Sequence, residues 1–511
     1  MGDRREARPR QAASHRLHAR CFETKAMAER TGSPLLLALA LALVALRSLV
    51  PAFSERSLDS DQAIIGLMAK HLSEFQNFPL FFYGQNYMLG VQAWIAVPFF
   101  WLGGPTVAML RLPTVLINGA VVVALILLFA RLGIRPLGGF VAVLPLIATT
   151  PVVSAALVET IGASIEPFAW VLILWALRDR PGWWGPVFCL AYLHREFVLF
   201  AAPALAAAQW REGRWWSLAA LGRAAAGFAA AWILIDVLKR SINLYGPPGG
   251  DHVATSLAME VQQILTWLTF DLRPYLARTG QVLLEALPDM LGGRPYLLAT
   301  YGVLGTGGAG SILAGLSLAA ALLVVILRLP FLIRQTPPKA REDAVLFYLA
   351  LIALQTMLVY GLNSGIPVGG VPVIRYLLFA LLLPVTLLAW FFLRERKRFF
   401  RSLVVVSMCL WALATVADAS RLLRDHVRSP PDNPHREITD YLVSRDIRFG
   451  RAMYWDAYVV TFLSREQVIL ASTGKVRISA YQARVDEAES VVTLTRQPCT
   501  AEIRVAAWCL E

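Results

Sequence analysis

The strongest constraint on the fold is a series of apolar runs, each close to the length that crosses a lipid bilayer. The runs at 34–53, 106–129, 216–238 and 343–362 are nearly free of charged residues. A helix of about 20 apolar residues spans the hydrocarbon core. Hydrophobic residues make up 57% of the 511 positions and charged residues only 16%, whereas soluble proteins carry about 25% charged residues. The sequence therefore predicts an all-α polytopic membrane protein.

Further apolar runs raise the expected number of transmembrane helices to about eleven. They lie at 138–150, 153–177, 184–193, 197–209, 309–333, 373–393 and 400–417. The runs at 184–193 and 197–209 are short for a full crossing, so we expect a pair of helices that meet at His194. Loops rich in Arg and Lys, such as 394–398, then all fall on one side. This asymmetry places the N-terminus in the cytoplasm and the C-terminus outside.

Composition divides the chain into three parts. Residues 1–33 are polar and basic and are expected to form a cytoplasmic tail. Residues 34–418 form the transmembrane domain, with a first outer loop at 54–105 and a long outer loop at 239–305. In residues 419–511, no apolar run is long enough to span a membrane. This part is expected to be a small extracytoplasmic α/β domain of roughly 90 residues, about enough for its own core.

The C-terminal part has patterns typical of alternating strands and helices. Strands are predicted near 467–470, 491–494 and 503–506, and helices at 434–445 and 479–489. Cys499 and Cys509 both lie in this part. They could form a disulfide bond if the domain faces an oxidising compartment.

The net charge of +13 would suggest a nucleic-acid partner in a soluble protein. Here the Lys and Arg residues cluster in short loops between apolar runs, which is the pattern that orients a membrane protein. We therefore expect no nucleic-acid partner. The sequence has no Cys/His spacing typical of zinc sites and no glycine motif that cradles phosphate. It predicts no cofactor, and a divalent metal is left open.

Asp59 and Asp61 lie just beyond the first apolar run, where an amphipathic helix begins. Transfer of a sugar from a lipid phosphate to a hydroxyl needs a base that takes the acceptor proton. Asp61 is the expected base, and Asp59 is expected to orient the acceptor or a water molecule. The alternative is a helix cap, because Asp and Ser satisfy free amides and the dipole at a helix start.

The departing phosphate in such a transfer needs cations that stabilise its charge. Arg111, Arg195 and Arg375 lie at predicted outer ends of membrane segments, and the arginine fork fits phosphate oxygens. Arg111 and Arg375 could instead be anchors that reach to the interface. His194 and Glu196 flank Arg195 and are candidate substrate-binding residues, because intramembrane charge is usually functional. The alternative is a self-neutralised kink.

Several segments resemble the GT-C superfamily of membrane glycosyltransferases, especially its protein-mannosyltransferase and aminoarabinose-transferase branch, family 39-like. In the first 135 residues they are the runs 59–63, 78–88 and 108–113. Arg375-Tyr376 resembles the Arg-Tyr that opens a late span in this family, and 454–458 is similar to outer-domain segments of bacterial members.

Five residues of these regions are further candidate substrate-binding residues. They are Tyr83, Gln85, Tyr87, Gln92 and Tyr376. For Tyr83, Gln85 and Tyr87 the alternative is an ordinary position at the water–lipid boundary.

The resemblance implies an inverting sugar transfer from a polyprenyl-phosphate donor to an extracytoplasmic glycan, lipid or protein. It also implies that an acid of the first outer loop, here Asp61, is the base. In the family a Glu follows this acid directly, whereas this chain has Gln62. Relatives often carry a Glu just after the Tyr-Met segment, and Gln92 is the nearest equivalent. These departures argue against a metal or a second carboxylate at positions 62 and 92.

Two other functions compete with a glycosyltransferase of the plasma (inner) membrane. A transporter or flippase for a lipid-linked glycan would show inverted repeats and broken helices near the midplane. The chain shows no such repeat, and its suggestive polar residues lie toward one face. The third reading is a non-catalytic anchor that displays the C-terminal domain. For the first reading, the expected partners are the lipid-linked donor, the bilayer and the outer acceptor.

Overall fold

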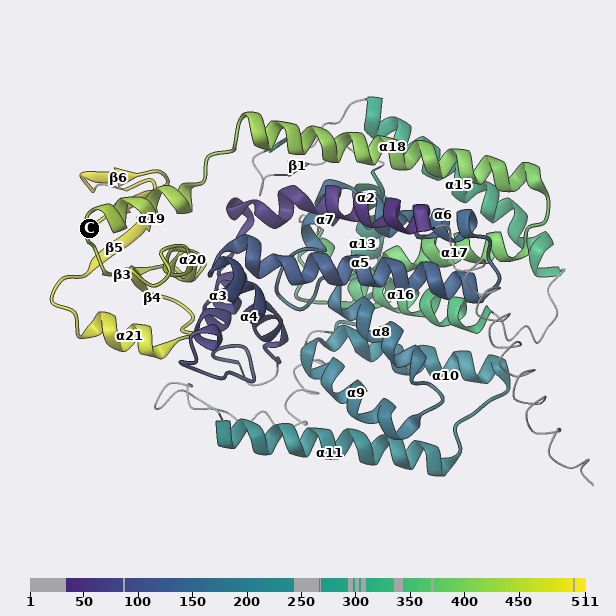
Figure 1. Ribbon diagram of the computed structural model, residues 1–511, viewed down its shortest axis with the longest axis horizontal. Helices are drawn as coiled ribbons and strands as arrows, with labels where there is room; N and C mark the ends of the chain where they lie inside the picture. The colour runs from purple at the N-terminus through teal and green to yellow at the C-terminus, as the bar shows by residue number, and fades with distance from the viewer. Residues whose placement is uncertain are drawn as a thin grey trace, which may run out of the picture.

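A bundle of long helices and a small domain containing a β-sheet make up the computed structural model (Figure 1). The structure describes residues 34–85, 88–242, 266, 268–292, 297–298, 303–304, 309–334, 343–368, 372–499 and 501–511. The predicted tail at 1–33, Tyr87 and about half of the predicted outer loop at 239–305 lie outside these residues.

Seven helices in the described part of the chain are long and apolar enough to cross a membrane. They are α2 (Pro34–Phe53), α5 (Val107–Arg131), α11 (Leu218–Ile242), α15 (Ala309–Arg334), α16 (Ala344–Leu362), η6 (Ile374–Leu381) continued by α17 (Leu382–Arg394), and α18 (Arg398–Arg428). Shorter apolar helices are α4 (Val91–Gly103), α6 (Pro136–Ile147) and α8 (Glu166–Ala176). The chain is therefore a multi-pass membrane protein, and the number of about eleven crossings stays a prediction.

Neighbouring helices of the bundle pack along much of their length. The pairs are α2 with α5, α15 with α18, α6 with α17, and α11 with α9 (Pro181–His194). Large apolar side chains such as Ile233 on α11 and Leu327 on α15 remain exposed. Such side chains suit a surface that faces lipid rather than water.

The predicted span 153–177 is wrong in its middle. The structure has the short helix α7 (Pro151–Ala156), then a segment without regular structure at 157–165, and then α8. Gly162 has φ +78°, a left-handed conformation that glycine adopts without strain. The helix therefore cannot continue through this segment, which we call the 157–165 loop.

The predicted break at His194 is confirmed. Helix α9 ends at His194, Arg195 is extended with φ −157°, and the 3₁₀ turn η2 (Glu196–Phe200) leads into α10 (Ala201–Glu212). In the long outer loop the structure describes α13 (Leu272–Gln281), η3 (Val282–Ala286), α14 (Leu287–Leu291), β1 (Leu297–Leu298) and β2 (Val303–Leu304).

The C-terminal domain has a five-stranded sheet in the order β4-β3-β5-β7-β6, with β3 parallel to β4 and β5. Its elements are α19 (Pro434–Ser444), β3 (Phe449–Ala452), α20 (Tyr454–Leu463), β4 (Ile469–Ser472), α21 (Ser479–Asp486), β5 (Val492–Arg496), β6 (Ile503–Val505) and β7 (Trp508–Leu510). The predicted strands and helices are confirmed, whereas β3, α20 and β7 were not predicted. Cys499 and Cys509 form a disulfide bond.

The first outer loop packs against this domain. It contains η1 (Glu55–Ser57) and α3 (Ser60–Ser73), and α3 and α4 lie between the bundle and the C-terminal domain (Figure 1). Helix α20 packs so closely on α3 that a Cβ atom on Gly66 would lie 2.5 Å from the Phe462 ring. The Glu466 carboxylate also bonds Lys70 at 2.6 Å. Helix α3 is thus fixed against the C-terminal domain.

Candidate active site

The start of α3 carries both acids of the predicted centre. The Asp59 side chain accepts a 2.9 Å hydrogen bond from the main-chain N–H of Gln62, so Asp59 caps the helix as the alternative reading expected. The Asp61 carboxylate accepts a 2.5 Å hydrogen bond from the hydroxyl of Tyr454 on α20. Asp61 therefore faces the C-terminal domain, and Asp59 lies nearer the bundle.

Arg111 is only 1% exposed and lies under the first outer loop. Its guanidinium donates to main-chain oxygens of Pro51, Ser54 and Ser57 at 2.7, 2.8 and 3.0 Å, and to Gln62 Oε1 at 2.8 Å. These bonds engage the donors that a phosphate would need. The structure thus does not support Arg111 as a phosphate ligand, and shows instead that it holds the loop that carries Asp59.

Glu159 was missed by the sequence reading and lies in the 157–165 loop. Burial raises the pKa of Glu159 to about 7, with a further rise from the charge of Asp59, against the opposing charges of Arg375 and Arg111. Asp59, Glu159 and Arg375 are therefore electrostatic neighbours. The signal in the sequence was an acid inside a predicted span, a position that is usually functional.

The pKa of Asp59 is also raised. Burial is the main cause, and Asp61 adds repulsion, while the amide of Gln62 and the charges of Arg375 and Arg111 favour the ionised form. The pKa values of both carboxyl groups are thus raised, and a carboxyl group whose pKa reaches about 7, as that of Glu159 does, can exchange a proton near neutral pH.

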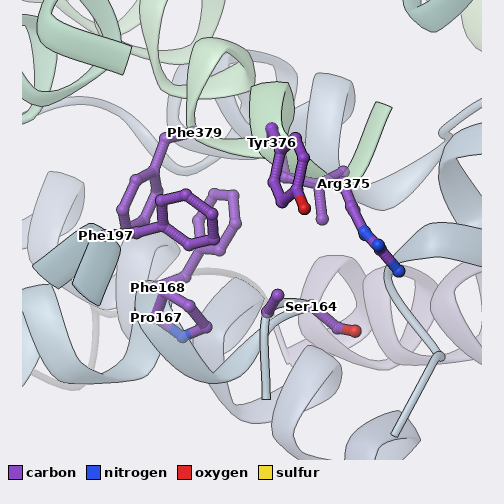
Figure 2. Close-up of a pocket in the computed structure, with 9 residues that line it drawn as sticks. Ser164, Pro167, Phe168, Phe197, Arg375, Tyr376 and Phe379 are labelled. Atoms are coloured by element: carbon purple, nitrogen blue, oxygen red, sulfur yellow. The ribbon is translucent and has the colours of Figure 1, made fainter. Parts of the chain in front are cut away.

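Arg375 and Tyr376 open η6 and line a small, partly open cavity beside this pair. Figure 2 shows the rings of Phe168, Phe197 and Phe379 gathered on one side of the cavity, with the Arg375 guanidinium directed away from them. The Arg375 Cζ atom lies 5.3 Å from the centroid of the Tyr376 ring. The cavity thus combines an apolar wall with a cationic edge.

Arg195 supports the 157–165 loop by hydrogen bonding to its main chain. Its guanidinium donates to the main-chain oxygen of Ile161, with Nε at 3.0 Å, and Nη1 lies 4.0 Å from the Glu196 carboxylate. A Cβ atom on Gly162 would come within 3.2 Å of Arg195 Nε and 2.8 Å of Gln92 Nε2. The position of Arg195 thus favours loop support over the predicted phosphate contact.

His194 and Gln92 lie in the same buried cluster. His194 Nδ1 accepts a 2.8 Å bond from Trp170, and its Nε2 has no partner among the described residues. Gln92 Nε2 donates to Glu166 Oε1 at 3.0 Å. A carboxylate thus lies next to position 92, although position 92 itself lacks one. Both side chains are buried behind the loop rather than in the cavity of Figure 2.

The remaining candidates lie apart from the carboxylate pair. The Tyr83 side chain is buried, and its hydroxyl bonds Asn77 at 2.9 Å and His71 at 2.8 Å, so it stabilises the first outer loop rather than facing a substrate. Gln85 follows in the adjoining turn, half-buried. Tyr87 lies outside the described residues. In the described part of the chain, no three His, Cys, Asp or Glu residues are grouped as a metal site would need.

Comparisons with known proteins bear on the fold. No protein-family model and no curated protein matches the chain. The crystal structure of ArnT from Cupriavidus metallidurans bound to undecaprenyl phosphate matches 93% of this chain and 97% of that chain, with a TM-score of 0.57 and 10% identity.

The apo oligosaccharyltransferase of Archaeoglobus fulgidus matches 90% of this chain and 69% of that chain, with a TM-score of 0.46 and 11% identity. A score of that size carries no conclusion about the fold. The match to ArnT extends over nearly the whole of both chains, from the bundle to the C-terminal domain. The chain therefore shares the fold of this ArnT structure.

Proposed function

We propose that this protein is a membrane glycosyltransferase that moves a sugar from a polyprenyl-phosphate donor to a hydroxyl of an extracytoplasmic acceptor. The observation that carries the proposal is the meeting of Asp59, Glu159 and Arg375 beside an apolar cavity. The fold of ArnT, solved with undecaprenyl phosphate, supports it. The acceptor is a glycan, a lipid or a protein.

Arg375 holds the donor phosphate in this proposal. Its guanidinium offers N–H groups that fit phosphate oxygens, and it lies at the cationic edge of the cavity. The rings of Phe168, Phe197 and Phe379 form the apolar wall of the same cavity (Figure 2). A polyprenyl phosphate has the same two parts, a charged head and an isoprenoid chain, so the first isoprene units fit against these rings.

The transfer itself requires one proton acceptor and one leaving group. The acceptor oxygen forms a bond to the anomeric carbon and gives its proton to the Asp59–Glu159 pair. The bond between that carbon and the phosphate oxygen breaks, and polyprenyl phosphate leaves with the electron pair. Arg375 stabilises the charge that develops on the phosphate.

Asp61 was the base expected from the sequence, and the raised pKa values of Asp59 and Glu159 support that pair as the base instead. The Asp61 carboxylate accepts the hydroxyl of Tyr454 and lies near Lys475 of the C-terminal domain. Asp59 is an electrostatic neighbour of Arg375, and its charge also acts on Glu159. In the proposed reaction Asp61 therefore orients the acceptor, and Asp59 takes part in the proton transfer.

The proposed location is the plasma (inner) membrane, with the N-terminus in the cytoplasm and the C-terminal domain outside. The Arg- and Lys-rich loops support this orientation. It places the start of α3 and the 157–165 loop at the outer surface, where a lipid-linked donor and an outer acceptor can meet.

The test is sugar transfer in membranes of a deletion strain supplied with a panel of labelled undecaprenyl-phosphate sugars. Asp59→Asn and Arg375→Ala are expected to lower label incorporation by about 100-fold or more. Asp61→Asn separates the two acids, with a smaller expected loss. Glu489→Gln, at an exposed carboxylate of the outer domain, is the control.

Two results contradict the proposal. One is transfer at the wild-type rate in both Asp59→Asn and Arg375→Ala. The other is label that crosses the bilayer on its lipid without ever reaching an acceptor, which identifies a transporter.

A further inference from the structure

Three polar side chains lie on one face of α5 beneath the proposed site. Arg111, Thr114 and Asn118 are spaced i, i+3 and i+7, which places them on the same side of a helix. All three are buried, at 1%, 1% and 0% exposure. Polar groups in a membrane-spanning helix are costly unless they are bonded, so their partners indicate what they do.

The upper end of this row is connected to Asp59. Gln62 Oε1 accepts from the Arg111 guanidinium at 2.8 Å, and Gln62 Nε2 donates to the main-chain oxygen of Ser57 at 3.1 Å. The main-chain N–H of the same Gln62 donates to the Asp59 carboxylate. One residue therefore links Arg111 to Asp59.

The lower end of the row is connected to Glu159. Asn118 Nδ2 donates to the main-chain oxygen of Leu157 at 2.8 Å. Thr114 Oγ1 lies 3.1 Å from the main-chain oxygen of Val158 and shares its hydroxyl hydrogen between that oxygen and the oxygen of Arg111 in its own helix, at 2.5 Å. Leu157 and Val158 are the two residues immediately before Glu159. On α2, Arg47 Nη2 donates to Asn118 Oδ1 at 2.7 Å and so fixes the orientation of the amide.

We propose that Thr114 and Asn118, together with Arg111, are positioning residues that hold Asp59 and Glu159 at the spacing required for sugar transfer. The inference rests on the proposed function, since it assigns both carboxylates to the reaction. Two like charges repel, so a loop alone would let them separate. A rigid helix bonded to both loops prevents that separation.

Three variants of α5 test the inference with a matched control. Asn118→Leu and Thr114→Val remove the bonds to Leu157 and Val158, and Thr114→Ser keeps the hydroxyl. Thr356→Val is the control, because Thr356 is also buried and, within the part of the chain that the structure describes, its hydroxyl bonds only Ile352 of its own helix.

The first readout is amide hydrogen exchange across 157–165, measured by mass spectrometry on the purified protein. Asn118→Leu and Thr114→Val are expected to speed exchange there by about tenfold, which corresponds to the loss of one hydrogen bond. Thr114→Ser and Thr356→Val are expected to exchange in this loop like the wild type.

The second readout is the split between binding and turnover. Asn118→Leu is expected to bind undecaprenyl phosphate within twofold of the wild type, while transfer falls by about 100-fold because the carboxylates are misplaced. Thr114→Ser, which keeps the hydroxyl that Thr114→Val lacks, is expected to transfer sugar like the wild type. A variant that merely weakened the fold would lower binding and transfer together.

Wild-type exchange across 157–165 in both Asn118→Leu and Thr114→Val overturns the inference, whatever the activity. Faster exchange with full transfer overturns it too, because the spacing would then not matter. If the wild type transfers no sugar while exchange in the loop still responds, the proposed function fails and the bonding of the loop by α5 stands.

Discussion

At the scale of single residues, the site depends on which side chains are already bonded. Arg111 has its donors engaged by Gln62, Pro51, Ser54 and Ser57, whereas Arg375 lies at a cavity edge. The Arg111 guanidinium must break several buried hydrogen bonds to reach a ligand, and leaving their acceptors without partners costs a large amount of free energy. The difference between these two arginines is therefore one of partners rather than of chemistry.

Glu159 gives the clearest prediction about pH. In the proposed reaction the carboxylate pair accepts a proton, so transfer would require its ionised form, and burial raises the pKa of Glu159 to about 7. The rate of transfer is therefore expected to rise with pH through about 7. The measurement is kcat between pH 5 and pH 9 in the wild type and in Glu159→Gln.

Glu159→Gln is expected to lower the rate of transfer by about 100-fold and to remove its rise with pH through about 7. Asp59, Arg375 and Arg111 are the charged groups that interact with Glu159. If the rate in Glu159→Gln still rises with pH through about 7, the rise belongs to another group, and the role given to Glu159 is contradicted.

At the scale of elements, the first outer loop is fixed from both sides. Arg111 bonds it to α5, and α20 packs against α3 on the other side. Burial raises the pKa of Glu466, but hydrogen bonds from His71, Lys70 and Tyr481 together outweigh this and lower it to about 2. Glu466 therefore stays ionised between the domain and α3 at neutral pH.

Gly66 tests this packing. A Cβ atom there would lie 2.5 Å from the ring of Phe462, so Gly66→Val is expected to force α20 away from α3. Overpacking of this kind costs about 1–3 kcal/mol. Thermal unfolding and protease sensitivity of the C-terminal domain measure the effect.

The matched control for this substitution is Gly280→Val. Gly280 is also a helical glycine, and no described atom beyond its chain neighbours and its own helix's backbone lies within 4 Å of the position its Cβ would take. Equal loss of stability in the two variants would show that the close approach of α20 to α3 contributes nothing.

Much of the architecture follows from local pattern. Apolar runs identified the long helices. Alternating apolar residues identified β4, β5 and β6, and helical patterns identified α19 and α21. Glu159 was hidden because it lies within an apolar stretch that reads as one span, and the break depends on Gly162 and on bonds from distant residues. The partners of Arg111 lie 49 to 60 residues away in sequence, so spacing alone could not distinguish it from Arg375.

At the scale of the whole molecule, three segments far apart in the sequence meet at one place. Asp59 comes from the first outer loop, Glu159 from the loop before α8, and Arg375 from the start of η6. The bundle holds all three, and the C-terminal domain packs over the first of them (Figure 1). The shared fold with ArnT extends across both parts.

A structure of the protein with undecaprenyl phosphate bound tests this arrangement most directly. The phosphate oxygens are expected within about 3 Å of the Arg375 guanidinium, a hydrogen-bonding distance, with the first isoprene units against Phe168, Phe197 and Phe379. Arg375→Ala is expected to lose this density. A phosphate bound at Arg195 or at the cytoplasmic side, with Arg375 untouched, would contradict the proposed site.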